Sequence, residues 1–181
     1  ANEENATRTN SDYAAETPAA HSIMIDALSF KYDLYSPRDI LADINLSIPN
    51  GKVTAIVGAS GSGKTTLVKL LLGFYEPLSG SIRVGDTLLS EFNPGWWRSQ
   101  CGAVMQEGYL FSGTIARNIA ISDDEPDIER IRQAARVANI ADYIEALPLG
   151  YNTMIGQDGQ GISQGQRQRI LIARVVYKNP M

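Results

Sequence analysis

The feature that most constrains this chain is a glycine-rich octapeptide, Gly-Ala-Ser-Gly-Ser-Gly-Lys-Thr, at residues 58–65. An apolar, β-branched run at residues 53–57 precedes it, and a largely apolar run at residues 66–72 follows it. These flanks predict a buried strand before the loop and a helix after it. Glycines let backbone N–H groups turn inward, and the start of a helix adds further unpaired N–H donors. The stretch fits the P-loop pattern G-x-x-x-x-G-K-[ST], which predicts a polyphosphate ligand.

Two side chains of this loop carry the expected chemistry. In the P-loop pattern the lysine, here Lys64, reaches the β- and γ-phosphates, and the hydroxyl of the next residue, Thr65, binds Mg²⁺. The alternative is a glycine turn with no ligand, but a chance match with both flanks in place is rare. The sequence therefore predicts a nucleotide-binding loop.

Composition limits the setting in which such a loop works. Hydrophobic residues make up 44% of the 181 residues and charged residues 20%, as expected for one globular domain. The net charge of −4 argues against binding nucleic acid through a basic face. No apolar run is long enough to cross a membrane, so a role at a membrane would need another segment or subunit. The single cysteine, Cys101, excludes an internal disulfide and is interpreted as a buried, inert thiol.

Periodicity and turn signals predict an α/β fold. The polar residues 1–21 predict a flexible linker or tail. The fold is expected to combine a mainly parallel sheet around the P-loop, an antiparallel β portion from the N-terminal strands, and a helical portion. Besides residues 53–57, strands are expected at residues 23–30, 44–48, 81–84 and 102–105. Besides residues 66–72, helices are expected from residue 94, at 114–119, 127–139 and 140–147, and from Ser163 to about Lys178.

Four further segments follow a fixed order around the P-loop. They are Phe30-Lys31-Tyr32, Val104-Met105-Gln106, Thr153-x-Ile155-Gly156-x-x-Gly159, and the stretch at residues 161–169. Together they resemble the nucleotide-binding domain of ATP-binding cassette (ABC) proteins, over about residues 22–180. The details are most similar to exporters fused to their membrane domain, particularly peptide and bacteriocin exporters. The resemblance implies a P-loop NTPase core, an ATP-binding domain at residues 22–181 and a helical subdomain at about residues 107–160.

The resemblance also implies roles for single residues. Tyr32 resembles the aromatic that stacks on adenine, although a tyrosine packed at a strand end is the alternative. Gln106 resembles the glutamine that completes Mg²⁺ coordination and reports the γ-phosphate; a surface glutamine is the alternative. The stretch at residues 163–166 resembles the signature that faces the ATP of a second copy, although a capped helix that contacts nothing is the alternative. The implied catalytic residues are Lys64 and Gln106, the Mg²⁺ ligands Thr65 and Gln106, and the ATP-binding residues Tyr32, Gly58, Ser60, Gly61, Ser62, Gly63, Lys64, Thr65, Thr66, Ser163, Gly165 and Gln166.

At the level of the whole protein, the resemblance implies an ATPase that drives export of a substrate, with a peptide among the candidates. It would work as a dimer of nucleotide-binding domains at the cytoplasmic face of the cell membrane, coupled to a transmembrane domain. Residues 114–119 and the segment around Gly156 resemble the surfaces that meet that domain. For Trp96 and Trp97 core packing is favoured. The arginines Arg167, Arg169 and Arg174 predict a solvated or salt-bridged helix face.

Some positions depart from the family pattern. Gln164 stands where the family usually has glycine, and Gln157 and Arg117 stand where exporters often have glutamate. The sequence stops at Met181, before the Asp-Glu and histidine that the family would supply next. We therefore expect this chain to be a truncated domain that binds Mg-ATP weakly, hydrolyses it negligibly, and either is only marginally stable or pairs with another chain. A soluble ABC-type ATPase and a non-hydrolysing nucleotide-binding module remain the alternatives.

Overall fold

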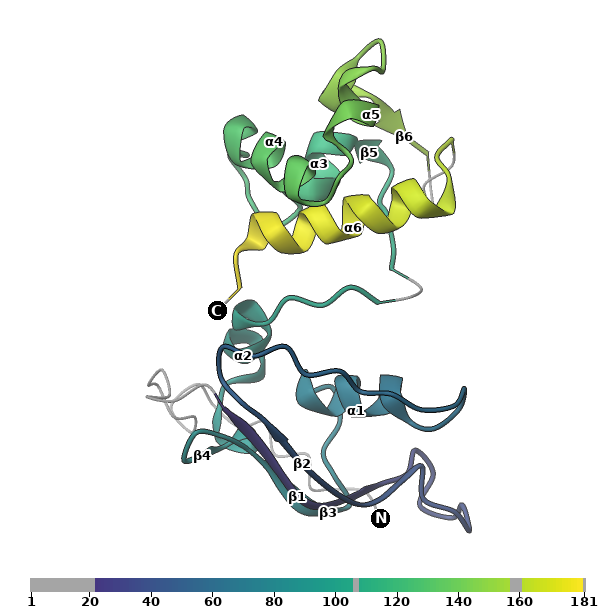
Figure 1. Cartoon of the computed structure of the whole chain (residues 1–181), viewed down its shortest axis with the longest axis vertical. Coiled ribbons are helices and arrows are strands. Elements are labelled where there is room, and N and C mark those ends of the chain that lie inside the picture. The colour runs from purple at the N-terminus through teal and green to yellow at the C-terminus, as the bar shows by residue number, and fades with distance from the viewer. Residues whose placement is uncertain (1–21, 106–107, 157–160, 181) are drawn as a thin grey trace, which may run out of the picture. The chain divides into compact units, whose positions relative to one another are not determined.

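A computed structural model describes residues 22–105, 108–156 and 161–180 (Figure 1). The predicted linker at residues 1–21 lies outside the described residues, as do Gln106, Gln157 and Gly159. The chain divides into two compact units, Ala1–Arg98 and Ser99–Met181. Each unit contains a hydrophobic core made only of its own residues.

The first unit is built on an antiparallel sheet of four strands in the order β2-β1-β3-β4. In the central strand, Ile23 pairs with Ile48 of one neighbour and with Val84 of the other. The antiparallel N-terminal portion and the strands predicted at residues 23–30, 44–48 and 81–84 are therefore confirmed. The strands are β1 (Ile23–Phe30), β2 (Leu41–Ile48), β3 (Ser79–Val84) and β4 (Thr87–Leu88).

A bulge in β1 sets which of its side chains face the core. Ile25 and Leu28 are both buried although they are three positions apart, where a regular strand would alternate every second residue. Ala27 supplies the extra residue, with a φ of 46°, and the pairing register shifts there. The side chain of Asn45 accepts a hydrogen bond from the Ala27 N–H at 2.8 Å. The bulge therefore turns Leu28 inward without leaving that backbone donor unpaired.

Helix α1 (Lys64–Leu71) packs on this sheet through its apolar face. Its Leu67 and Leu70 join Ile25, Leu28 and other strand residues in one buried cluster. The remaining elements of this part of the chain are η2 (Leu89–Glu91) and α2 (Pro94–Gln100). The prediction of the helix after the P-loop is confirmed.

The two tryptophans of α2 pack as predicted. Trp97 is only 7% exposed, and its indole Nε1 donates to the Leu71 carbonyl at 2.8 Å. Trp96 is half-buried and stacks on Phe92 with ring centroids 5.5 Å apart. Trp97 therefore joins α2 to the end of α1, and Trp96 joins α2 to Phe92, which comes just before α2.

The strands predicted at residues 53–57 and 102–105 are not seen in this structure, where both segments are irregular. Val53 and Val57 are almost fully exposed, and Val104 is 38% exposed. No strand lies beside either segment among the described residues, so their backbone groups have no ladder to join. The two sheets that the structure describes are both antiparallel, and a parallel sheet around the P-loop is not seen in this part of the chain.

The second unit is mainly helical. Its longest helix, α6, contacts α3 and α4 along its length (Figure 1), and their apolar faces form one buried cluster. The helices predicted from residues 114, 127, 140 and 163 are confirmed. The elements are β5 (Gly113–Thr114), α3 (Ile115–Ile119), α4 (Ile128–Val137), α5 (Ala141–Glu145), η3 (Gly150–Asn152), β6 (Met154–Ile155) and α6 (Gln164–Lys178). None of the helices in the described ranges is long and apolar enough to cross a bilayer.

Arg174 on α6 departs from the predicted solvated or salt-bridged role. Its guanidinium is half-buried and donates to the carbonyls of Asn118 at 2.8 Å and Tyr109 at 3.0 Å. A third bond reaches the Asn118 side-chain oxygen at 3.3 Å. Burial lowers the pKa of this guanidinium, because the charged form loses solvation. Arg174 therefore fixes the segment before α3 to α6 through neutral acceptors.

Candidate nucleotide-binding site

The glycine loop turns tightly before α1. Gly61 and Gly63 have φ values of 79° and 86°, in the left-handed region that favours glycine. A Cβ on Gly63 would also lie 2.6 Å from Cδ2 of Leu41 and 3.1 Å from the Ile40 carbonyl oxygen. Only glycine therefore allows both this backbone turn and the close approach of the β2 segment.

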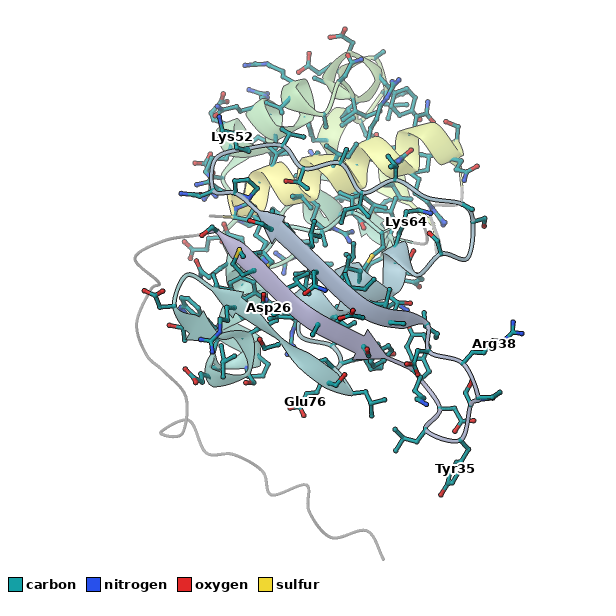
Figure 2. All side chains as sticks on the ribbon, turned by 60° about the horizontal axis from the view of Figure 1, so that its bottom comes forward. Asp26, Tyr35, Arg38, Lys52, Lys64 and Glu76 are labelled. Atoms are coloured by element: carbon teal, nitrogen blue, oxygen red, sulfur yellow. The ribbon has the colours of Figure 1, made fainter. Side chains whose placement is uncertain are left out.

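The ammonium group of Lys64 lies inside the loop. Its Nζ donates to the carbonyl oxygens of Gly58 and Ala59, both at 2.7 Å, and to the Ser62 hydroxyl at 3.2 Å. Figure 2 shows Lys64 at the start of α1. All three acceptors are neutral, so the positive charge is solvated by dipoles and remains available to an anion. A phosphate that entered the loop would meet this charge directly.

Side chains of the described residues do not cap the first turn of α1. Gly63 caps the helix without a side-chain acceptor, and no acidic residue lies in the first turn. The intrahelical ladder begins where the Leu67 N–H bonds the Gly63 carbonyl at 2.8 Å. The preceding N–H groups and the positive end of the helix dipole thus favour an anion at this end. The adjacent Thr65 is exposed, so its hydroxyl is accessible at the same end of the helix.

These residues suit Mg²⁺ carried by a nucleotide. Groups of three or more His, Cys, Asp or Glu able to hold a metal are absent from the described residues. Mg²⁺ commonly binds through one or two protein oxygens plus the phosphates of a substrate. The Thr65 hydroxyl fits such a limited protein contribution, whereas Gln106, the other predicted ligand, lies outside the described residues.

Tyr32 lies beside the same helix. It follows the end of β1, and its hydroxyl forms a hydrogen bond of 3.2 Å with the hydroxyl of Thr66. Its ring contacts Phe30 and Tyr75, and 49% of the residue remains exposed. The structure thus brings Tyr32, Lys64 and Thr65 together around the start of α1, with the Tyr32 ring half open to solvent.

The predicted signature stretch lies at the start of α6, in the second unit. Ser163 caps the helix: its hydroxyl accepts from the Gln166 N–H at 3.3 Å, while the Gln166 side chain accepts from the Ser163 N–H at 2.8 Å. Gly165 is exposed, and a Cβ there would meet nothing within 4 Å. The helix start is well formed, and its glycine faces open space among the described residues.

Sequence reasoning missed two groups. Tyr75 contacts Tyr32, and its sequence signal was an aromatic pair, Phe74 and Tyr75, between the predicted helix at residues 66–72 and the predicted strand at residues 81–84. Asn118 is 2% exposed and bonds both the N–H and the carbonyl of Phe111 at 2.9 Å. No local pattern distinguishes Asn118 from a surface asparagine, because its partners come from another segment.

A glycine loop that places a lysine and an open helix start at one point defines a P-loop nucleotide-binding protein. The family model described as "ABC transporter" matches residues 41–181 of this chain. The chain therefore belongs to the ABC transporter family.

Two relatives and one solved structure illustrate the similarity. The chain is 44% identical to mouse "ATP-binding cassette sub-family B member 10, mitochondrial", over 83% of this chain and 22% of that protein. It is 45% identical to "Exotoxin translocation ATP-binding protein PaxB" of Pasteurella aerogenes, over 84% of this chain and 21% of that protein. A solved bacterial Atm1-family ABC exporter with ATP bound matches with a TM-score of 0.88 and 36% identity, over 95% of this chain and 30% of that one. The chain thus spans about a fifth of the length of these relatives.

Proposed function

We propose that this chain is the ATP-binding domain of an ABC exporter and that it binds the phosphates of Mg-ATP at residues 58–65. The observation that carries the proposal is the Lys64 ammonium, held by neutral oxygens beside the open start of α1. In a member of the ABC transporter family, this arrangement supports a triphosphate ligand.

Each residue then has a physical role. Lys64 exchanges its loop carbonyls for the β- and γ-phosphate oxygens, and the Thr65 hydroxyl contributes to Mg²⁺. The loop around the phosphates is formed by Gly58, Ser60, Gly61, Ser62 and Gly63. The next ATP-binding residue, Thr66, lies in α1. Tyr32 stacks on the adenine ring, a contact of about 1–3 kcal/mol for a base on an aromatic side chain. Gln106 completes the Mg²⁺ contacts as a second catalytic group.

The proposal extends to partners by similarity. The names of two relatives, which include "ATP-binding" and, for PaxB, "Exotoxin translocation", support an ATPase that drives export, with a peptide among the candidate substrates. The start of α6, with Ser163, Gly165 and Gln166, would close over the ATP of a second nucleotide-binding domain. A transmembrane domain would place the assembly at the cytoplasmic face of the cell membrane.

We also propose that residues 53–57 and 102–105 are strands of a mainly parallel sheet in the whole protein. Both segments are apolar, and both leave valines exposed in this chain. Burial of such side chains between a sheet and its helices would be favourable, since parallel strands are normally covered on both faces.

Titration with Mg-ATP tests the central proposal. Lys64→Ala removes a charged donor to the phosphates, so we expect ATP affinity to fall by at least about tenfold. Lys52→Ala is the matched control, because Lys52 is an exposed lysine outside the loop. Equal ATP affinity in the parent chain and the Lys64→Ala variant would refute the proposal.

A further inference from the structure

The side chains around Tyr32 form a compact aromatic group. The Tyr32 ring meets Phe30 at a centroid distance of 5.0 Å and an angle of 87°. It meets Tyr75 at 5.2 Å and 80°. Phe30 and Tyr75 also contact each other, at 5.5 Å. Each ring therefore touches the other two, and both contacts to Tyr32 are edge-to-face arrangements of the kind that aromatic pairs prefer.

The side chains that contact Tyr32 differ in how deeply they are buried. Phe30 is 5% exposed and belongs to the core on the sheet, so it is fixed by packing. Tyr75 is 42% exposed and lies in the segment between α1 and β3. Tyr75 therefore contacts Tyr32 from a segment that lies outside the buried cluster on the sheet.

The hydroxyl end of Tyr32 is held separately. Its oxygen bonds the Thr66 hydroxyl at 3.2 Å, and Thr66 is buried in the first turn of α1. Lys69, one turn further along, places its Nζ 6.0 Å from the Tyr32 ring centroid. The helix that begins with Lys64 thus restrains one end of the ring, and Phe30 and Tyr75 restrain its body.

No neighbour in this group stacks parallel on Tyr32, and about half of the residue stays exposed. A ring held in this way can offer a flat surface of fixed orientation to another aromatic ring. Pre-organisation of this kind increases affinity because less side-chain freedom is lost on binding.

We infer that Tyr75 is a positioning residue for the nucleobase: it holds the Tyr32 ring in the orientation that receives the base, without contacting the phosphates. The inference rests on the proposed function, and deepens it by dividing nucleotide recognition into two parts. The loop at residues 58–65 recognises the polyphosphate, and the group of Phe30, Tyr32 and Tyr75 recognises the base.

Two ligands separate these parts. Mg-ATP presents both a base and phosphates, whereas inorganic tripolyphosphate with Mg²⁺ presents phosphates alone. In the full 181-residue chain, Tyr75→Leu should weaken Mg-ATP binding by about three- to tenfold and leave tripolyphosphate binding unchanged. Tyr75→Phe keeps the ring and should restore the affinity of the parent for Mg-ATP.

Phe74→Leu is the matched control, because Phe74 is an exposed aromatic next to Tyr75 and makes no ring contact with Tyr32 among the described residues. It should bind both ligands as the parent does. The inference is overturned if Tyr75→Leu keeps the parent affinity for Mg-ATP, or if it weakens both ligands equally, as general loosening of the fold would. Either result can occur while Lys64→Ala still loses ATP, so it leaves the proposed function standing.

Discussion

Among single residues of the second unit, Tyr177 combines hydrogen bonds of its hydroxyl and carbonyl with a cation–π contact of its ring. It is 4% exposed, and its hydroxyl donates to Asp123 at 2.6 Å while accepting from the Asp127 N–H at 3.1 Å. Arg130 donates to the Tyr177 carbonyl at 2.7 Å and lies 4.5 Å over its ring. One side chain near the end of α6 thus holds the segment before α4 and the first turn of α4.

These contacts shift two acid–base equilibria. The Tyr177 hydroxyl is the largest cause that lowers the pKa of Asp123 below its ordinary value of 3.8. Burial, followed by the bond to Asp123, raises the pKa of Tyr177 above 10.0. A lowered carboxylate pKa stabilises the folded state above the ordinary pKa, and this stabilisation disappears as the pH falls through the folded-state value.

Tyr177→Phe tests this linkage. At about pH 7 the variant should unfold at a lower temperature than the parent, because it loses the bond to an ionised Asp123. The difference should shrink as the pH falls below the ordinary pKa of an aspartate and through the lowered pKa of Asp123, where the parent loses the carboxylate as well. Thermal unfolding followed by circular dichroism at several pH values measures this difference.

Tyr143→Phe removes a hydroxyl from a partly buried tyrosine that packs on the same core, and serves as the control. Its effect on the unfolding temperature should not change with pH over this range. A Tyr177→Phe penalty that stays constant from neutral to acid pH would contradict the assignment.

At the scale of elements, α6 carries the predicted signature at its first turn and its anchoring residues further along. The reciprocal bonds between Ser163 and Gln166 satisfy donors on both residues. Such a capping box stabilises the helix start from local sequence alone. The orientation of the signature residues therefore depends on the side chains of Ser163 and Gln166 as well as on the packing of α6 in the buried cluster of the second unit.

Replacing the cap should loosen this turn. Ser163→Ala is expected to cost about 1 kcal/mol of folding free energy, within a range of about 0.5–2, because the Gln166 N–H loses its acceptor. Ser163→Asn keeps a good capping group and should cost much less. Urea unfolding gives the free energies, and amide exchange at Gln166 and Arg167 locates the change. An alanine variant no less stable than the asparagine variant would show that the box contributes nothing.

The elements also show which parts of the fold the sequence alone could predict. The helices capped by Asp127 and Ser163 were predicted correctly, because capping and apolar periodicity are local signals. Residues 53–57 have strand composition, yet a strand also needs a neighbour, which no local pattern supplies. The short pair β5 and β6 has too few residues to show any periodicity.

The site follows the same division. The tight glycine turn and the helix that starts at Lys64 were predictable from contiguous residues. The contacts of Tyr32 with Thr66 and Tyr75 were not, because they join segments brought together only by packing α1 on the sheet. Tertiary packing therefore supplies the detail around a motif that the sequence alone can locate.

At the scale of the whole molecule, the two hydrophobic cores are separate in sequence. One contains Ile25 with residues of β2, α1 and β3, and the other contains Ile131 with residues of α3, α5 and α6. The phosphate-binding loop depends on the first core and the signature turn on the second. Damage to the first core should therefore affect the phosphate-binding loop before the signature turn, and damage to the second core should do the reverse.

Matched methyl deletions test this independence. Ile25→Val and Ile131→Val each remove one methylene from a side chain that is 1% exposed, at a cost of about 0.5–1.5 kcal/mol. Since local openings follow cooperative units, Ile25→Val should speed amide exchange in β1, β3 and α1, and Ile131→Val in α3, α4 and α6. Hydrogen exchange read by mass spectrometry resolves these segments. If both variants speed exchange evenly along the chain, the two cores open together. A core substitution would then affect the loop around Lys64 and the turn around Ser163 alike, which would contradict their independence.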